Sequence, residues 1–292
     1  MKKYRILLLL FIIFISCSSV KDNAKPSTLM WEISSAGGKG KVFVLGSIHL
    51  ADERIYPLNP AIEKAFINSD ALVLEILVDE IDPMSIMQYL SFMDERTLES
   101  ELPPDVYEKI AEMFKKNGIP KQIYNKFKPW FAALTLQSDA FKSAGFSSAE
   151  GVDMHFLKKA RAKDMDVLEI ESLEIQMNLM DELGAFTGDF LKSVLEETDS
   201  AGESVDELIE AWKNGDADEI ERLTNKGNET KEFAEVMEKL NYQRNVKMVE
   251  KIEEYLKSDK TYFVVVGAAH VVGKRGIAGL LENNNKYIIK RY

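Results

Sequence analysis

Two of the three histidines in this 292-residue chain follow the same kind of segment. His49 ends the segment VFVLGSIH and His270 ends the segment YFVVVGAAH, so in both a run of β-branched and aromatic residues precedes the pattern GxxH. Such runs predict buried β-strands, and glycine lets the chain turn tightly where a strand ends. Because ligands of open α/β sheets bind at this edge, we expect both histidines to line one site.

Histidine side chains at such an edge can bind a divalent metal ion, and manganese, cobalt and zinc are the candidates. A carboxylate would complete the site. Glu75 is the best candidate, because it ends the apolar segment ALVL, where an unpaired charge would be costly. If its strand lies next to that of His49, both side chains reach the same edge. The alternative is that the histidines are structural and that Glu75 lies on an exposed strand end.

Further polar residues could support such a site. Glu150 belongs to the segment EGVD at the start of a predicted helix, where acidic residues also act as ordinary caps. Arg244 and Asn245 are adjacent within another predicted helix, and Arg244 forms either a surface salt bridge or a clamp for an anion or carbonyl group. The segment LEIE at 168–171 ends a strand with both acids on one face, so at most one edge of the sheet can use them.

The remaining pattern predicts an α/β fold with a central mixed or parallel sheet. Strands are expected at residues 31–34, 42–45, 71–76, 166–170, 261–266 and 287–290. A helix starting near Asn59 follows the second strand and a helix over 274–281 follows the fifth, which indicates duplicated strand-helix units. Residues about 83–145 and 172–258 have helical periodicity, and we expect them to form an inserted helical cap over the sheet edge.

The N-terminus predicts export from the cell. Residues 1–17 begin with MKKYR, continue with about ten apolar residues and end at Cys17, the only cysteine. This apolar run is too short to span a bilayer, which needs about 20 residues. We interpret it as a lipoprotein signal peptide with Cys17 as the lipidation site; the alternative is a cleaved signal with an incidental cysteine. Residues 18–30 would form a flexible tether and 31–292 the α/β domain, anchored to the periplasmic or cell-surface face of a bacterial membrane.

The net charge of −11 disfavours nucleic acids and anionic lipid surfaces as partners. The acidic residues are concentrated between positions 195 and 221, and this run predicts a solvated helix face rather than a cation store. The chain has no GxSxG elbow, HExxH helix, phosphate-binding loop or dinucleotide fingerprint. With Cys17 in the anchor, no cysteine nucleophile is left, so metal-assisted or His/Glu acid-base hydrolysis is the chemistry that these residues favour.

The same motifs resemble the TraB/PrgY/GumN family, which is related to the Tiki proteases. The resemblance rests on FVLGSIHL, YPL and SDALVLE between residues 43 and 75, and on EGVD, LE with Gln176, the pair Gly215-Asp216, the pair at 244–245, and VGAAHVVG at 266–273. It covers essentially everything after the tether. It implies a domain of the erythromycin-esterase and ChaN-like kind, with both GxxH motifs facing one site.

The Tiki branch consists of divalent-metal-dependent peptide hydrolases, so the resemblance implies a role for each matching residue. The implied metal or catalytic set is His49, Glu75 and His270, supported by Glu150, Arg244 and Asn245. We therefore expect a lipid-anchored metallohydrolase whose partner is a peptide or protein substrate. The alternatives are a lipoprotein that binds a peptide or haem in the same cleft without turnover, and a catalytically silent structural domain.

Overall fold

The structure is a computed structural model that describes residues 26–292 except 36, 38–39, 184–200, 226–233, 236 and 284–285. The predicted signal peptide and Cys17 lie outside the described residues. The end of the predicted tether 18–30 belongs to the fold, because the main-chain N–H groups of Ser27 and Thr28 donate to the carbonyl oxygen of Tyr292 at 3.1 and 3.0 Å. Within the described part, no helix has the length and hydropathy needed to cross a membrane.

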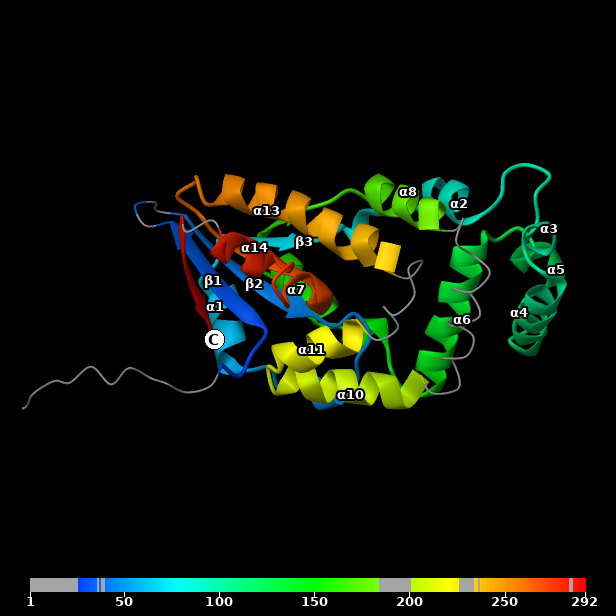
Figure 1. The fold of residues 1–292 in the computed structure, drawn as a ribbon, viewed down its shortest axis with the longest axis horizontal. Coiled ribbons are helices and arrows are strands. Elements are labelled where there is room, and N and C mark those ends of the chain that lie inside the picture. The colour runs from blue at the N-terminus through cyan, green and yellow to red at the C-terminus, as the bar shows by residue number, and fades with distance from the viewer. Residues whose placement is uncertain are drawn as a thin grey trace, which may run out of the picture.

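A six-stranded mixed sheet forms the centre of the domain, with the strand order β4-β3-β5-β2-β1-β6 (Figure 1). The strands are β1 (Met30–Ser35), β2 (Lys41–Ser47), β3 (Ala71–Leu74), β4 (Asp166–Glu169), β5 (Thr261–Gly267) and β6 (Tyr287–Arg291). β4, β3, β5 and β2 pair in parallel, whereas β1 is antiparallel to both of its neighbours. The predicted α/β class and all six predicted strands are confirmed.

Both predicted strand-helix-strand units form, but their strands are interleaved. Helix α1 (Pro60–Ile67) connects β2 to β3, and α14 (Ile277–Glu282) connects β5 to β6. The Glu75 strand does not lie next to the His49 strand, because β5 lies between them and pairs with both. The three strands that precede His49, Glu75 and His270 are therefore consecutive in the sheet, with the His270 strand in the middle.

Helices cover both faces of the sheet. The two crossovers run toward opposite edges, and right-handed crossovers of this kind place their helices on opposite faces. On one face, Phe66 of α1, Phe156 of α7 (Val152–Ala162) and Phe263 of β5 have ring centroids 4.8–5.6 Å apart. On the other face, α13 (Arg244–Tyr255) packs beside α14. The central strands β2, β3 and β5 are thus buried on both sides, which leaves the sheet edge at their ends as the place for polar side chains.

Both predicted insertions are helical. Besides α13, their described helices are α2 (Pro83–Leu90), α3 (Leu98–Glu101), α4 (Pro104–Lys116), α5 (Lys121–Tyr124), α6 (Pro129–Ser143), α8 (Leu173–Leu183), α10 (Ala201–Lys213), α11 (Ala217–Thr224) and a π-helix (Glu238–Gln243). Helices α3 to α6 have their own hydrophobic core, which includes Ile110 and Phe114, and α3 to α5 lie at the end of the molecule farthest from the sheet (Figure 1). α10 and α11 lie closer, beside the strand ends.

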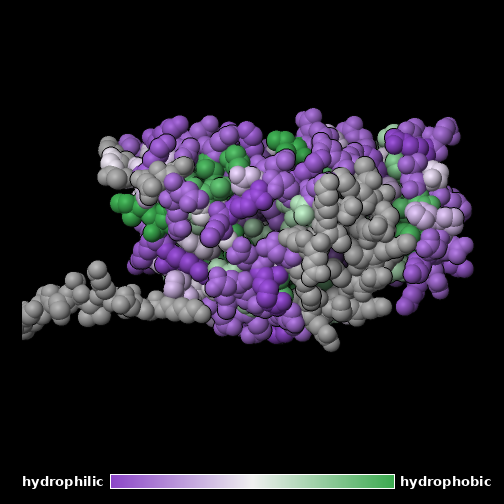
Figure 2. All heavy atoms as spheres, in the orientation of Figure 1, coloured by the Kyte–Doolittle hydropathy of each residue, from purple (hydrophilic) through white to green (hydrophobic). Residues whose placement is uncertain are grey.

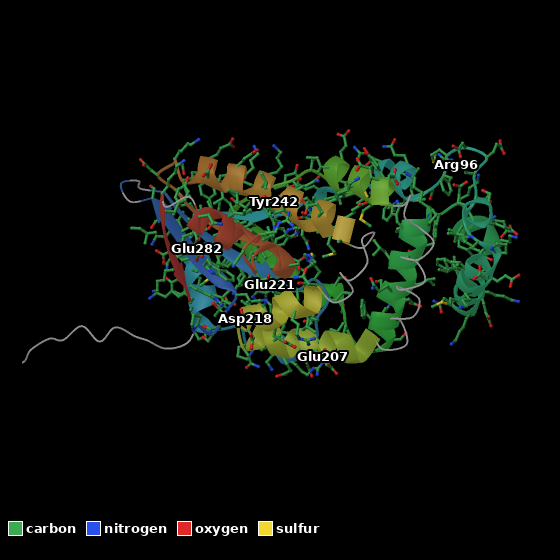
Figure 3. The ribbon with its side chains drawn as sticks, viewed as in Figure 1. Arg96, Glu207, Asp218, Glu221, Tyr242 and Glu282 are labelled. Atoms are coloured by element: carbon green, nitrogen blue, oxygen red, sulfur yellow. The ribbon has the colours of Figure 1, made fainter. Side chains whose placement is uncertain are left out.

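The visible surface of the molecule is largely hydrophilic (Figure 2). Acidic side chains gather on α10 and α11, where Glu207, Asp218 and Glu221 are labelled in Figure 3. Glu207 and Asp218 are exposed, and Asp216 accepts a hydrogen bond from the N–H of Glu219 at the start of α11. The described part of the acidic run is therefore a solvated helix face, as its sequence predicts.

One ion pair between α1 and α7 has a testable pH dependence. Oε2 of Glu63 lies 2.5 Å from Nζ of Lys159, and Oε1 lies 3.0 Å from Nε2 of His155. Burial raises the pKa of Glu63, but the bonds from Lys159 and His155 outweigh it and hold the pKa below 4.5. A group whose pKa is lowered by folding stabilises the fold above its unfolded pKa and loses this effect as the pH falls through the folded pKa.

We therefore expect Glu63→Gln to lower the free energy of unfolding by about 1 kcal/mol at pH 7. The difference from the wild-type protein should shrink as the pH falls below 4.5, because the wild-type carboxylate is then protonated too. Urea unfolding of both proteins at pH 7 and pH 3 measures this. An equal difference at the two pH values would show that the ion pair is not its source.

Candidate active site

His49, Glu75 and His270 come together around Gly267 at the end of β5. His49 follows β2, Glu75 follows β3, and His270 lies in the short turn Ala268–His270. A Cβ atom at Gly267 would lie 3.4 Å from Nε2 of His49, 3.4 Å from Oε1 of Glu75 and 3.6 Å from Cδ2 of His270. The structure thus brings together the three residues that the sequence places in one site, and the missing side chain of Gly267 leaves space between them.

Glu75 is a buried carboxylate with both oxygens engaged. Oε1 accepts a hydrogen bond from the N–H of Gly267 at 2.7 Å, and Oε2 accepts from Arg244 at 2.6 Å and from Gln176 at 3.1 Å. Burial raises the pKa of Glu75, but the charges of His270, Arg244 and His49 outweigh it and lower the pKa to about 2. Glu75 is therefore ionised at neutral pH despite its burial.

His270 is buried and held in one orientation. Its Nδ1 lies 2.6 Å from Oδ1 of Asn245, and Nδ2 of Asn245 donates to the carbonyl oxygen of Arg275 at 2.9 Å. Because the amide oxygen can only accept, Nδ1 carries the proton, which leaves the lone pair on Nε2, 3.9 Å from Oε1 of Glu75. Burial lowers the pKa of His270 to about 4. At neutral pH it is a neutral imidazole, the form that binds a metal or accepts a proton.

His49 is the most open of the three residues, with 57% of its side chain exposed. Its Nδ1 lies 3.2 Å from Oδ1 of Asp153, which leaves Nε2 facing Gly267. Partial burial lowers the pKa of His49, but the hydrogen bond and charge of Asp153 outweigh it and raise the pKa to about 9. The two histidines are thus oriented in the same way through Nδ1, but their surroundings shift the two pKa values in opposite directions, upward for His49 and downward for His270.

Arg244 forms neither a surface salt bridge nor an unoccupied binding site for an anion or carbonyl group. Its side chain is 14% exposed, and it lies between two carboxylates, with Nη2 2.6 Å from Oε2 of Glu75 and 2.6 Å from Oε2 of Glu171. Nε donates to both oxygens of Glu171 at 2.9 and 3.0 Å, and Nη1 donates to the carbonyl oxygen of Leu240 at 3.0 Å. This network fixes the position of the Glu75 carboxylate through its Oε2 atom.

Glu171 and Asp153 are site residues that the sequence did not single out. Glu171 is only 4% exposed, and its main-chain N–H donates to the carbonyl oxygen of Glu75 at 3.0 Å. The segment LEIE did contain a sequence signal for Glu171, an acid just after a strand. β4 pairs with β3, and the segments that follow these two strands continue side by side, which brings Glu171 next to Glu75. Asp153 belongs to EGVD, in which Gly151 is also constrained: a Cβ there would lie 2.5 Å from the carbonyl oxygen of His49.

Glu150 is placed differently from the other predicted residues. Its side chain is exposed, and its main-chain carbonyl oxygen accepts a hydrogen bond from the hydroxyl of Tyr56 at 2.9 Å. Among the described residues, no hydrogen bond of the His49, Glu75 and His270 cluster involves the Glu150 carboxylate. A catalytic role for Glu150 stays a prediction.

The cluster fits a divalent metal in the chemistry of its donors. Two imidazole nitrogen atoms and one carboxylate are a common ligand set. Nδ1 of His270 has the hydrogen bond that fixes metal ligands, and Nδ1 of His49 lies beside the carboxylate of Asp153. Across the described ranges, however, no group of three or more His, Cys, Asp or Glu side chains is spaced to hold a metal ion. The donor types and their orientation are therefore suitable, while the spacing is not that of an assembled metal centre.

Fold and site together define an α/β protein in which two GxxH histidines and one glutamate meet at the sheet edge. The chain matches the model of the TraB/PrgY/gumN family over residues 29–290, and it belongs to this family. It is 23% identical to "Uncharacterized protein YbaP" of Escherichia coli (strain K12) over 246 residues, which cover 84% of this chain and 89% of the relative. The Shigella flexneri protein of the same name is 23% identical over 240 residues, covering 82% and 87%. No solved structure gives a significant match.

Proposed function

We propose that this chain is a metal-dependent hydrolase of peptides or proteins. The observation that supports the proposal is the arrangement around Gly267, where Nε2 of His49, Oε1 of the ionised Glu75 and the ring of His270 face the same space. His49, Glu75 and His270 would hold a manganese, cobalt or zinc ion. Such an ion, when bound, acts as a Lewis acid and lowers the pKa of a bound water molecule.

The other residues of the site have positioning roles in this proposal. Asp153 orients His49, Asn245 orients His270, and Arg244 with Gln176 holds Glu75. Contact of Arg244 or Asn245 with a developing oxyanion is not part of the proposal, because the hydrogen bonds of both side chains are already directed to the cluster and its supports. Loss of either residue would act through the geometry of the cluster.

We also propose that the protein is exported and lipid-anchored through Cys17. The chain enters the domain beside the site, since the N–H of Gly46 near the end of β2 donates to the carbonyl oxygen of Leu29 at 2.8 Å. Residues 18–26 can extend over about 30 Å. An anchor at Cys17 would therefore keep the sheet edge with the site close to the membrane surface, where its substrates would be envelope or secreted polypeptides.

The first test is the metal content of protein purified without chelator, compared with the His49→Ala/His270→Ala double variant by elemental mass spectrometry. We expect about one ion per wild-type chain and a loss of this ion in the double variant, because both imidazole ligands are gone. Hydrolysis of a complex peptide mixture, followed by mass spectrometry, should stop in the presence of chelator and return when the ion is added back.

The same experiment separates the alternatives. Hydrolysis that is unchanged by chelator would contradict the metal and assign the reaction to acid-base chemistry of the three residues. Stoichiometric capture of peptide or haem without product would contradict the hydrolase, and a Soret band on titration would identify haem. A double variant that keeps both its metal and its turnover would show that the site lies elsewhere.

A further inference from the structure

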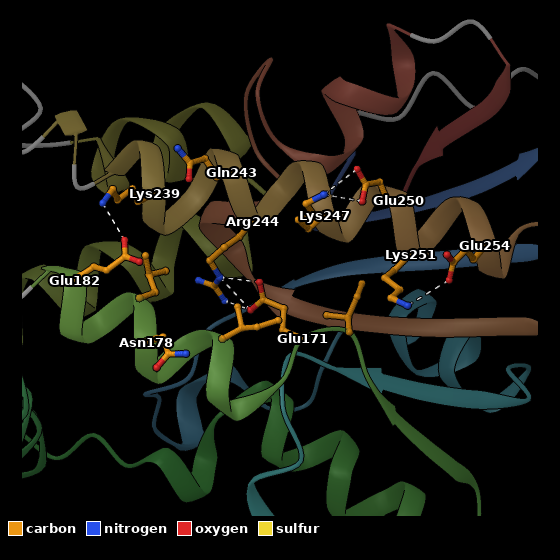
Figure 4. Close-up of a pocket in the computed structure, with 13 residues that line it drawn as sticks. Glu171, Asn178, Glu182, Lys239, Gln243, Arg244, Lys247, Glu250, Lys251 and Glu254 are labelled. Carbon is orange, nitrogen blue, oxygen red and sulfur yellow. Dashed lines mark hydrogen bonds and ion pairs between the residues drawn. The ribbon is translucent and has the colours of Figure 1, made fainter. Parts of the chain in front are cut away.

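A groove of about 660 Å³ runs between α8 and α13 beside the candidate active site (Figure 4). Arg244 and Glu171 line one part of it, and Arg244 also contacts Glu75, so the groove and the site share these side chains. Ile170, Ile175 and Leu179 contribute apolar surface, and Ile175 is 55% exposed. A ligand that extends beyond the site on this side would therefore meet an accessible, partly apolar groove.

The charged side chains of the groove neutralise one another. Each of the four cations in its lining is paired with an acidic residue of the lining: Lys239 with Glu182 at 3.0 Å, Arg244 with Glu171 at 2.6 Å, Lys247 with Glu250 at 3.1 Å, and Lys251 with Glu254 at 3.4 Å. A phosphate or carboxylate ligand would have to compete for these cations. The groove is better matched to an uncharged ligand.

Two side-chain amides in the groove have unused hydrogen-bonding capacity. Asn178 lies on α8, and Gln243 lies at the end of the π-helix that leads into α13, on the other side of the groove (Figure 4). Neither amide is hydrogen-bonded to another residue that the structure describes. A carboxamide has one acceptor and one NH₂ donor group, which is the complement of the C=O and N–H of a peptide unit. Gln243 directly precedes Arg244, so its side-chain amide lies next to the candidate active site.

We propose that this groove binds an extended, uncharged stretch of the polypeptide substrate. Asn178 and Gln243 pair with its main chain, and its apolar side chains contact Ile175 and Leu179. This inference rests on the proposed function, because it names the part of a peptide that lies beside the bond to be hydrolysed. It assigns the specificity to apolar, unfolded segments rather than to charged ones.

The test measures binding of a fluorescein-labelled, amidated eight-residue peptide of leucine, serine and glycine to the full chain by fluorescence anisotropy. The double variant Asn178→Leu/Gln243→Met keeps the size of both side chains and removes their hydrogen bonds. We expect its Kd to rise at least tenfold, since each lost bond is worth about fivefold. Gln122→Met, an exposed residue on α5 away from the groove, is the matched control and should leave the Kd unchanged.

Mass spectrometry of the same samples keeps the two proposals apart. Weaker binding by the double variant, with no cleavage by the wild-type protein, would support the groove and contradict the hydrolase. An equal Kd for the double variant and the wild-type protein, or no binding by the wild-type protein, would overturn the groove whether or not cleavage occurs. Ile175→Asp is a second probe, and unchanged affinity in this variant would contradict the apolar contact.

Discussion

Replacing Arg244 with methionine is expected to lower the free energy of unfolding by about 3–5 kcal/mol. Arg244 lies between Glu75 and Glu171, whose side chains are 13% and 4% exposed. Methionine preserves much of the packing but leaves two buried carboxylates facing each other without a cation. Removal of one partner from such a network costs far more than the network contributes to stability, because the uncompensated charges stay buried. Urea unfolding followed by circular dichroism measures the loss.

Arg54→Met is the matched control, because Arg54 also joins two acids, Asp52 and Asp206, but with 47% of its side chain exposed. It should change stability far less, since water screens an exposed pair. Adding Glu171→Gln to the Arg244 variant should restore part of the loss. The loss should also shrink as the pH falls, because Arg244 helps to lower the pKa of Glu75 and the pKa rises without it. If the Arg244 variant is no less stable than the Arg54 variant, the ion pairs of Arg244 with Glu75 and Glu171 do not contribute the expected free energy of unfolding.

Replacing Glu75 with glutamine is expected to reduce kcat/KM for a cleaved peptide by about 10²- to 10⁴-fold. Glutamine keeps the size of the side chain, and its one amide oxygen can still accept a hydrogen bond from either Gly267 or Arg244, which donate to different oxygens of Glu75. It lacks the negative charge that would hold a divalent ion or accept a proton. Peptide cleavage and metal content, measured in the same preparation, should therefore fall together.

Glu169→Gln is the control for this variant. Glu169 ends β4 and pairs with Leu74, the residue that precedes Glu75, but its side chain is exposed. It should leave both cleavage and metal content unchanged. Full activity in the Glu75 variant would contradict the proposed function, whereas loss of activity with a normal metal content would assign Glu75 to proton transfer rather than to metal binding.

Much of the sheet could be predicted from the sequence because its strands are nearly continuous runs of apolar β-formers. The segments before His49 and His270 are such runs, and each is followed by glycine, so the strand ends are also visible. Glu75 could be singled out because a carboxylate that ends an apolar strand needs a partner. These are local properties, which a single sequence records within a window of a few residues.

The order of the strands was not visible in this way. β5 inserts between β2 and β3, although it follows them by more than 180 residues, and this puts the His270 strand between those of His49 and Glu75. The burial of Arg244 was missed for the same reason. Its partner Glu75 is 169 residues away, and within its own helix Arg244 has the pattern of an ordinary surface residue.

The sequence by itself determined which residues form the strands and which three side chains leave their ends, because β-propensity, apolar runs and glycine act over a few neighbouring positions. Only the tertiary structure decided how these side chains are supported. Asp153 meets His49, Asn245 meets His270, and Arg244 joins Glu75 to Glu171 because the parallel crossovers bring distant segments within hydrogen-bonding distance. The partner of a buried polar group is chosen by the whole fold, since any group left unpaired there would cost more than local structure can offset.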